Sequence, residues 1–333
     1  MIRHCFMGFC VATPKFDIVK NATCSKSFLE VTVSMRGTAY IAAVLLGTAL
    51  FGQPRPEGAD ISGVWNFATL TPLGRPAKFV TKPSLTKEEA AAFEKEILGA
   101  GFQRLGSGPV FDEGVWYEWG HLAIVNGRYL SSLVSDPPDG RIPESTEASK
   151  ARLAGRAAAT ARSSGPEDRT LSERCLRSAS GPPMFPSADA NIAEVIQSHD
   201  HVVLLVEKFH DARIVPIDSR PRPPGTPRSW MGDSRGHWED NTLVIDTTNF
   251  TDKIGLTGRF DGSLHLVERF TRSSPTTLLY EVRIDDPTAY VRPWSVTVPW
   301  VRTNEPLLEF ACHEGNYQHP FLAAHTLPLC STG

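Results

Sequence analysis

The chain has 333 residues, 41% of them hydrophobic, and its formal net charge is −3 at pH 7. This composition excludes nucleic acid as an expected partner, since binding the phosphate backbone needs a basic patch. A chain of this length and hydrophobic content can bury the core of one large β domain or of two small ones.

A three-part secretory signal begins at Met35. Arg36 supplies the basic start, residues 39–50 form a short apolar run, and a polar, proline-rich segment follows. The run is shorter than the roughly 20 apolar residues that span a bilayer, which argues against the alternative, an uncleaved membrane anchor. We therefore predict a signal peptide over residues 35–52 and a periplasmic or secreted protein without stable membrane insertion after cleavage.

The segment upstream of the signal, residues 1–34, carries three cysteines and no clear periodicity. We interpret it as an extension produced by a start codon assigned too early. Residues 53–59 are then a linker, residues 60–320 a single β-rich domain, and residues 321–333 a tail. Loss of the first 52 residues removes five basic and two acidic side chains, which leaves 29 basic and 35 acidic residues and a net charge of −6.

The first half of the mature chain combines short strands with helical insertions. Ile61, Trp65 and Phe67 alternate around a glycine, a pattern typical of a β-strand. Capping boxes, in which a threonine precedes a glutamate by three positions, open two of the predicted helices. The predicted elements are a strand over 60–67, a helix over 86–98, a strand over 128–135, a helix over 146–162 and a short helix over 172–176. We expect two or three helices in all, inserted at about residues 84–180.

From residue 190 onward, one predicted strand follows another. The strands cover 193–198, 202–208, 212–216, 236–239, 242–247, 264–272, 276–285, 294–303 and 307–312. Asp240 and Asn241 predict a tight hairpin between two of them. Successive antiparallel strands with short turns predict a mainly β fold, in which an antiparallel meander closes into a barrel or a sandwich.

Three cysteines lie in the predicted mature chain: Cys175, Cys312 and Cys330. An odd number permits at most one internal disulfide. Cys175–Cys312 would tie the middle of the chain to its last strand, and Cys312–Cys330 would staple only the tail. We favour Cys175–Cys312, because closing a longer loop removes more entropy from the unfolded chain. The spacing matches no zinc pattern, and we expect no metal.

Four segments resemble a family of exported bacterial proteins. They are residues 230–239 (WMGDSRGHWE), 243–250 (LVIDTTNF), 135–143 (SDPPDGRIP) and 311–317 (ACHEGNY). The resemblance covers residues 60–317; it implies export and transfers no catalytic residue. Gly63 and Trp65 also resemble the Gly-x-Trp that opens the first strand of lipocalins. That second resemblance implies a lipocalin-like barrel, from which this chain departs in its helical insertions.

Alternation along two predicted strands places charged side chains among apolar ones. Glu268 shares a face with Leu264 and Phe270, and Arg302 ends the row that starts at Trp294. Burial raises the pKa of a carboxyl unless a cation pairs with it. We predict that Glu268 and Arg302 form a polar patch inside an apolar cavity. A structural ion pair or a charge at the barrel mouth is the alternative.

A second charged group comprises His210, Asp211 and Arg213. A histidine beside an acid can serve as a general acid–base group. Neighbouring residues of a strand point to opposite faces, so His210 and Asp211 share a cavity only if the strand bends there. Asp211 and Arg213 do share a face, and a simple ion pair between them is the alternative.

Further candidates lie toward the C-terminus. Residues 232–236 resemble a tight polar turn that would place Arg235 at the end of the hairpin. His313 precedes a glutamate and is a candidate for proton transfer. Trp238 and Trp294 offer aromatic faces of the kind that sugar-binding clefts use. The sequence contains no helical His-x-x-x-His motif.

These observations leave three functions open. One is an acid–base enzyme, a hydrolase, lyase or isomerase acting on sugars or aromatic compounds; another is a lipocalin-like carrier of an apolar ligand; the third is a structural envelope protein with a filled interior. The candidate catalytic residues are Glu268, His210, Asp211 and His313, and the candidate ligand-binding residues are Arg213, Arg235, Trp238, Trp294 and Arg302. An enzyme needs an acid near a base in an open cavity, and a carrier needs an apolar pocket. We expect a small-molecule ligand and no cofactor.

Overall fold

The computed structural model describes residues 60–104, 118–162, 165–176, 181–217, 222, 225, 227–252 and 262–312. These residues all belong to one compact unit, residues 55–333. The predictions made for residues 1–59, for His313, for Cys330 and for the tail lie outside the described residues.

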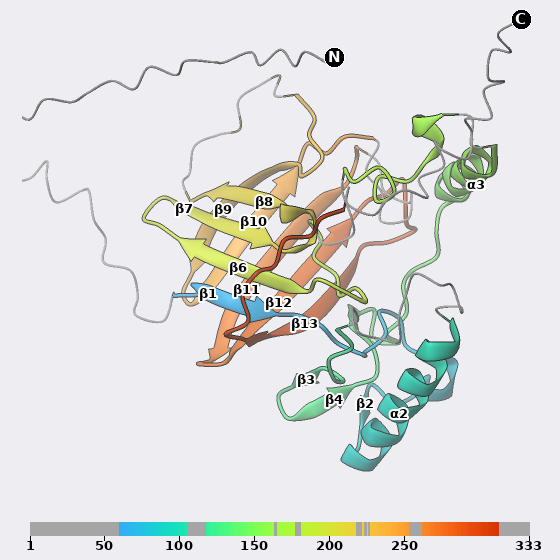
Figure 1. Cartoon of the computed structure of the whole chain (residues 1–333), viewed down its shortest axis with the longest axis vertical. Helices are drawn as coiled ribbons and strands as arrows, with labels where there is room; N and C mark the ends of the chain where they lie inside the picture. Colours follow the sequence, from blue (N-terminus) through green and yellow to red (C-terminus); the bar gives the residue numbers. More distant parts are fainter. Residues whose placement is uncertain are drawn as a thin grey trace, which may run out of the picture. The chain divides into compact units, whose positions relative to one another are not determined.

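Ten strands form the main sheet. They are β1 (Gly63–Asn66), β5 (Val134–Asp136), β6 (Ile192–Gln197), β7 (His201–Val206), β8 (Ala212–Pro216), β9 (Asp233–Glu239), β10 (Thr242–Thr248), β11 (His265–Ser274), β12 (Thr277–Asp285) and β13 (Trp294–Arg302). Their order is β8-β7-β6-β1-β13-β12-β11-β10-β9, and β5 pairs with β13 beside this path. The sheet curves into a nearly closed antiparallel barrel (Figure 1), which confirms the prediction of a mainly β fold.

The two ends of this sheet run in the same direction. Each neighbouring pair on the path is antiparallel, and nine alternating strands leave β8 and β9 parallel to each other. Antiparallel pairing is therefore not available between them. No backbone pairing joins β8 to β9 in the described part of the chain. We call the junction of these two strands the seam.

The inward side chains fill the barrel. Trp65, Phe67, Phe270, Tyr280 and Trp300 are all fully buried. The ring centroid of Trp300 lies 5.0 Å from that of Phe67, 5.5 Å from that of Phe270 and 5.6 Å from that of Tyr280. Each aromatic side chain of this kind buries roughly 150–250 Å². The period-two alternation that predicts the strands is thus the alternation between this core and the outer face.

A smaller hydrophobic cluster surrounds the first helix. Its elements are α2 (Lys87–Arg104), β2 (Ser84–Leu85), β3 (Ile124–Val125), β4 (Arg128–Leu130) and the 3₁₀ turn η3 (Ala77–Phe79). Leu85 of β2 and Phe93 of α2 are both buried in it. The predicted capping box forms, since the Glu89 amide donates to Thr86 Oγ1 at 3.2 Å and the Thr86 amide to Glu89 Oε2 at 3.1 Å. The helix does not end at residue 98 as predicted but continues past Gly99 and Gly101, because each glycine costs a helix only about 1 kcal/mol.

The second helix forms as predicted. α3 covers Glu147–Arg162, and the 3₁₀ turn η4 (Pro166–Asp168) follows it. Thr146 caps α3 by accepting the amide of Ser149 at 3.1 Å. Its hydroxyl also donates to the carbonyl of Thr288, which ties the start of α3 to the loop between β12 and β13.

Two predicted strands differ from the structure. The strand predicted over 128–135 is two strands, because β4 pairs with β2 and β3 whereas β5 pairs with β13. The segment predicted as a strand over 307–312 has no strand pairing. Both edges of β13 are already occupied, by β12 on one side and by β1 and β5 on the other, so the chain cannot add a strand there.

Two further predicted segments differ from the structure. The segment 172–176 keeps its capping box, with the Glu173 amide donating to Thr170 Oγ1 at 3.1 Å, but it is a turn and not a helix. Cys175 has a φ of 52°, which interrupts a helical path. The polar segment predicted as a turn over 232–236 is strand from Asp233 onward, because Asp233–Gly236 pair with Ile245–Thr248 of β10.

Candidate functional site

A polar network lies inside the barrel, centred on Glu268. The guanidinium of Arg213 donates to Glu268 Oε2 at 2.7 Å and to Oε1 at 3.1 Å. The Tyr280 hydroxyl donates to Oε1 at 2.9 Å, and the Thr247 hydroxyl to Oε2 at 3.5 Å. Ser234 Oγ lies 3.0 Å from Thr247 Oγ1. Glu268 is 0% exposed and Arg213 4% exposed, so this bidentate ion pair is fully desolvated.

This network spans the seam. Arg213 belongs to β8 and Ser234 to β9, the two strands that no backbone pairing joins. Between them, Glu268 of β11 and Thr247 of β10 complete a chain of side-chain contacts. Side-chain bonds therefore link the two ends of the sheet across the barrel.

Tyr280 belongs to the same network and connects Glu268 to the backbone at Met184. Its hydroxyl accepts the amide of Met184 at 3.0 Å while it donates to Glu268. Burial, and then the negative charge of Glu268, raise the pKa of Tyr280 well above its usual value. The phenol is thus a permanent donor to the carboxylate and not an acid of the physiological range.

Apolar contacts close the seam beside the network. A Cβ on Gly236 of β9 would lie 2.5 Å from Ile217 Cδ1 and 3.0 Å from Val215 Cγ1. The side chains of Val215, in β8, and of Ile217, just after β8, therefore lie over the backbone of β9 at Gly236. A residue without a side chain is what permits this approach.

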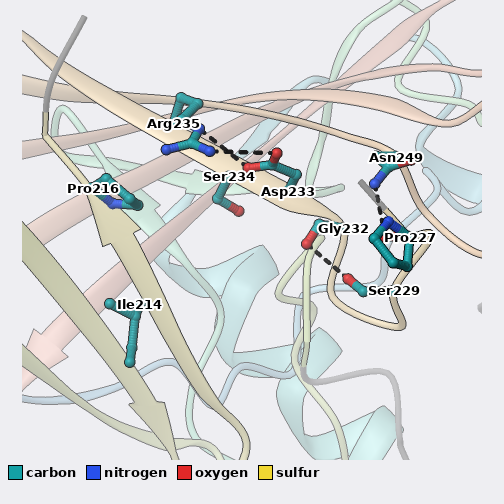
Figure 2. Close-up of a pocket in the computed structure, with 9 residues that line it drawn as sticks. All are labelled: Ile214, Pro216, Pro227, Ser229, Gly232, Asp233, Ser234, Arg235 and Asn249. Atoms are coloured by element: carbon teal, nitrogen blue, oxygen red, sulfur yellow. Dashed lines mark hydrogen bonds and ion pairs between the residues drawn. The ribbon is translucent and has the colours of Figure 1, made fainter. Parts of the chain in front are cut away.

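A groove of about 360 Å³ opens along the seam on the outer surface (Figure 2). Its lining residues come from β8, β9 and the turns next to β9: Ile214, Pro216, Pro227, Ser229, Gly232, Asp233, Ser234, Arg235 and Asn249. Ile214 and Pro216 lie on the strand across from the other residues in the view. The groove thus has an aliphatic wall and a polar wall.

The polar wall is held by internal bonds. Arg235 Nε lies 3.2 Å from Asp233 Oδ1, so these two charges neutralise each other. Asn249 Nδ2 donates to the carbonyl of Pro227 at 3.0 Å, and Ser229 Oγ donates to the carbonyl of Gly232 at 2.8 Å. Gly232 has a φ of +70°, and a Cβ there would lie 2.7 Å from the Thr248 carbonyl oxygen. Only glycine fits this turn, which shapes one end of the groove.

A charged cluster on the outer face adjoins the polar wall. Asp246 of β10 lies opposite Arg235 in the strand register. Its Oδ2 lies 2.6 Å from His265 Nε2, and its Oδ1 accepts from Arg222. Burial acts to raise the pKa of Asp246, but the bonds from His265 and Arg222 outweigh it and hold that pKa below its usual value. We made no sequence prediction for Asp246 or His265, although the alternation of β10 and β11 places both on the outer face.

The predicted partner of Glu268 is wrong. Glu268 lies on the inner face as predicted, but its cation is Arg213. Arg302 is exposed at the end of β13, where it lies 5.6 Å from the ring centroid of Trp65 and donates to the Ser62 carbonyl at 3.5 Å. Arg302 is therefore exposed and does not share the interior with Glu268. Strand alternation predicts which face a residue takes but not which strand lies across the barrel.

The predicted tryptophans are part of the core. Trp294 is 1% exposed and its ring packs against Tyr290 and Phe185, with centroids 5.4 and 6.2 Å away. Trp238 is partly buried against the same core. Neither residue lines the groove.

The predicted acid–base residues do not converge. His210 is exposed in the 3₁₀ turn η5 (Lys208–His210), which precedes β8, and Asp211 follows it. Glu268 lies in the closed interior instead. His313 lies outside the described residues. Of the predicted ligand-binding residues, Arg235 alone lines the groove.

The favoured disulfide forms. Cys175 and Cys312 are bonded across 137 positions of sequence, with their Cα atoms 5.7 Å apart. Within the part of the chain that the structure describes, no cluster of three or more histidine, cysteine or acidic residues could hold a metal ion. No helix among those residues is both long and apolar enough to cross a membrane.

The sequence and the structure were also compared with known proteins. No family model, no curated protein and no solved structure matches the chain.

Proposed function

We propose that the protein binds a small molecule in the groove at the seam. The observation that supports this is the pair of unlike walls, aliphatic on β8 and polar on β9 and its flanking turns (Figure 2). Ligand sites are typically clefts with an apolar lining and a few placed polar groups. A volume of about 360 Å³ lies at the lower end of that class, which limits the ligand to one or two rings.

The chemistry of the walls favours a neutral ring that carries hydroxyl groups, a sugar or a phenol. Ile214, 63% exposed, and Pro216 offer apolar surface to the flat side of a ring. Asp233 and Arg235 neutralise each other, so the ligand needs no net charge. Together they present both acceptors and donors, which is what a hydroxyl group can satisfy.

Binding is favoured over acid–base catalysis because of where Glu268 lies. A general acid or base must come within hydrogen-bond reach of its substrate. Glu268 is 0% exposed and already bonds to Arg213 and Tyr280. A carrier that holds its ligand inside the barrel is disfavoured for a related reason, since aromatic side chains occupy the centre of the interior.

The same proposal includes export. Disulfides persist in oxidising compartments, and the Cys175–Cys312 bond supports a periplasmic or secreted location. The signal peptide predicted from Met35 is the second support, and sequencing the N-terminus of the native protein tests it.

The binding proposal is tested by titrating the isotope-labelled protein with 4-nitrophenyl β-D-glucoside, which carries both a sugar and an aromatic ring. We expect saturable shifts in the amide spectrum that map to β8, β9 and the turn at Gly232. Replacing Ile214→Ser or Arg235→Gln should weaken binding about tenfold, a loss of roughly 1.4 kcal/mol.

The matched control is Val301→Ser on β13, an aliphatic residue that is 55% exposed and absent from the groove lining. It should leave the affinity unchanged. Shifts that map away from β8 and β9, or equal losses in Ile214→Ser and Val301→Ser, would contradict the proposed site. Absence of any saturable shift would favour the structural protein with a filled interior.

A further inference from the structure

The segment after β13, residues 303–312, crosses back to the turn that precedes β8. It leaves the sheet at Thr303, whose amide donates to the Val64 carbonyl at 3.0 Å. It ends at Cys312, which is bonded to Cys175. We call residues 303–312 the strap, because it is attached at both ends, to the sheet and by the disulfide.

The strap contacts the turn between β7 and β8 in three ways. The ring of Phe310 packs on that of Phe209, with centroids 4.9 Å apart. Lys208 Nζ lies 5.6 Å from the Phe310 centroid. The amide of Leu308 donates to Glu207 Oε1 at 3.3 Å. All three contacts fall on consecutive residues of one turn.

That turn has an unfavourable backbone. Phe209 has a φ of 62° and His210 a φ of 52°, and both carry a side chain. The left-handed region is uncommon for residues other than glycine, and more so for a bulky aromatic. Two such residues in succession persist only where the surrounding structure holds them.

The same turn buries a carboxylate. Glu207 is 6% exposed, and its Oε2 has no hydrogen-bond partner among the described residues. Burial, then the nearby charge of Glu118, raise the pKa of Glu207, and Glu305 of the strap adds to this. The adjacent cation, Lys208, is bonded to Asp189. The Leu308 amide of the strap therefore supplies a bond that this carboxylate needs.

The position of this turn determines where β8 begins. β8 starts at Ala212, two residues after His210. Arg213, which bonds to Glu268, and Ile214, which lines the groove, follow at once. A movement of the turn is thus transmitted along few bonds to the strand that forms one side of the seam.

We propose that the strap is a redox-sensitive clamp: while the Cys175–Cys312 disulfide is intact, the strap holds the turn at Glu207–His210 and keeps β8 in place at the seam. Only the coupling to ligand affinity rests on the proposed function; the clamp does not.

The chemical step is ordinary thiol–disulfide exchange with a dithiol reductant. One thiolate of the reductant attacks a sulfur of the Cys175–Cys312 bond, and a mixed disulfide forms as that bond breaks. The second thiolate then displaces the protein sulfur. The reductant ends as a cyclic disulfide, two electrons pass to the protein, and the two cysteine sulfurs take up the two protons as thiols. Dithiothreitol serves as the reductant in the test.

Hydrogen exchange measured by mass spectrometry tests the clamp on the full chain, with and without dithiothreitol. We expect exchange in residues 207–217 to become at least tenfold faster on reduction, while β11 and β12 keep their protection. The double variant Cys175→Ser/Cys312→Ser should show the same pattern without reductant. Unchanged exchange in 207–217 would overturn the proposal. An equal increase throughout the barrel would also overturn it, because the disulfide would then only stabilise the fold.

Phe310→Ala separates the clamp from the disulfide itself. It leaves both cysteines in place and removes the ring that packs on Phe209, so exchange in 207–217 should rise while the bond is intact. The matched control is Leu308→Ala, whose side chain is 62% exposed and whose amide bond to Glu207 remains. It should not change exchange in 207–217. Equal behaviour of the two variants would contradict the clamp.

Titration of the reduced protein with 4-nitrophenyl β-D-glucoside tests the coupling to the groove. We expect at least a fivefold loss of affinity on reduction. Faster exchange with unchanged affinity would overturn the coupling and leave the clamp. If the oxidised protein does not bind the glucoside, the proposed function fails, whereas the exchange experiment still decides on the clamp.

Discussion

The wall of the barrel and its seam are held together by different interactions. From β1 through β13, β12, β11 and β10, consecutive strands share backbone ladders, and β11, β12 and β13 are also the longest strands. At the seam, the described strands β8 and β9 are joined by side chains alone: the Arg213–Glu268–Thr247–Ser234 network and the contacts over Gly236. The direction of the strands excludes an antiparallel ladder between them, since nine alternating strands leave parallel ends.

This difference shows where the protein can be opened. A ladder distributes its stability over many bonds, whereas a buried ion pair balances its Coulomb attraction against the cost of desolvating two charges. Local opening begins where few backbone bonds must break. The groove lies along the seam, and the strap contacts the turn that leads into it. The predictions below test this contrast.

The largest effect is expected from Glu268→Leu. It leaves the Arg213 guanidinium buried without its anion, which costs about 3–5 kcal/mol. The double variant Arg213→Met/Glu268→Leu removes both charges and should recover most of that loss, because apolar replacements of a buried pair are often neutral. Urea denaturation gives both free energies of unfolding. A double variant as unstable as Glu268→Leu would show that seam closure needs the ion pair itself.

An intermediate effect is expected from Gly236→Val. The new side chain enters the space of Ile217 and Val215 and forces β8 away from β9, at a cost of about 1–3 kcal/mol. Gly236→Ala should cost less, since the Ile217 end can rotate aside. Gly155→Ala in α3, where nothing lies within 4 Å of the added Cβ, is the control and should be neutral or slightly stabilising. Denaturation midpoints that do not separate Gly236→Val from this control would mean that the seam is not tightly packed.

The smallest effect is expected from Glu207→Gln, and it depends on pH. The raised pKa of Glu207 means that the folded state holds the proton more tightly than the unfolded chain. Stability from this group is therefore fully present below the ordinary glutamate pKa and is lost as the pH rises through the raised value. As the pH rises, Glu207→Gln should become more stable than the native protein, by roughly 1 kcal/mol, since it cannot acquire a buried charge and keeps an acceptor for Leu308.

The measurement for Glu207→Gln is the urea midpoint at about pH 4, below the ordinary glutamate pKa, and at about pH 7. The advantage of the variant should shrink at the lower pH. Glu309→Gln, an exposed position on the strap, is the matched control and should change little at either pH. A Glu207→Gln protein less stable than the native one at both values would show that the carboxylate stabilises the turn.

Local patterns in the sequence predicted much of the fold. Alternation located the later strands and placed Glu268 on the inner face, where it is 0% exposed. The Asp240–Asn241 hairpin and the capping box at Thr86 and Glu89 form as their chemistry predicts. The disulfide was favoured because of the length of the loop it closes, and it joins Cys175 to Cys312.

The site could not be predicted in the same way. Glu268 finds Arg213 and not Arg302, and the groove joins Ile214 to Arg235, because the barrel brings together strands that are separated along the chain. Asp246 and His265 were missed because each looks like an ordinary outward residue of its own strand. The segment 307–312 has a strand-like sequence, but both edges of β13 are already paired.

The sequence by itself determined the position of most strands, which face of each of these strands is apolar, and where the two long helices and the Asp240–Asn241 hairpin begin. These properties depend on neighbours a few positions away, through the periods of strand and helix and the bonds of caps and turns. The tertiary structure alone decided the order of the strands, the parallel ends, and with them the seam, its ion pair and its groove. These depend on which distant strands become neighbours, and a period of two is the same for every strand.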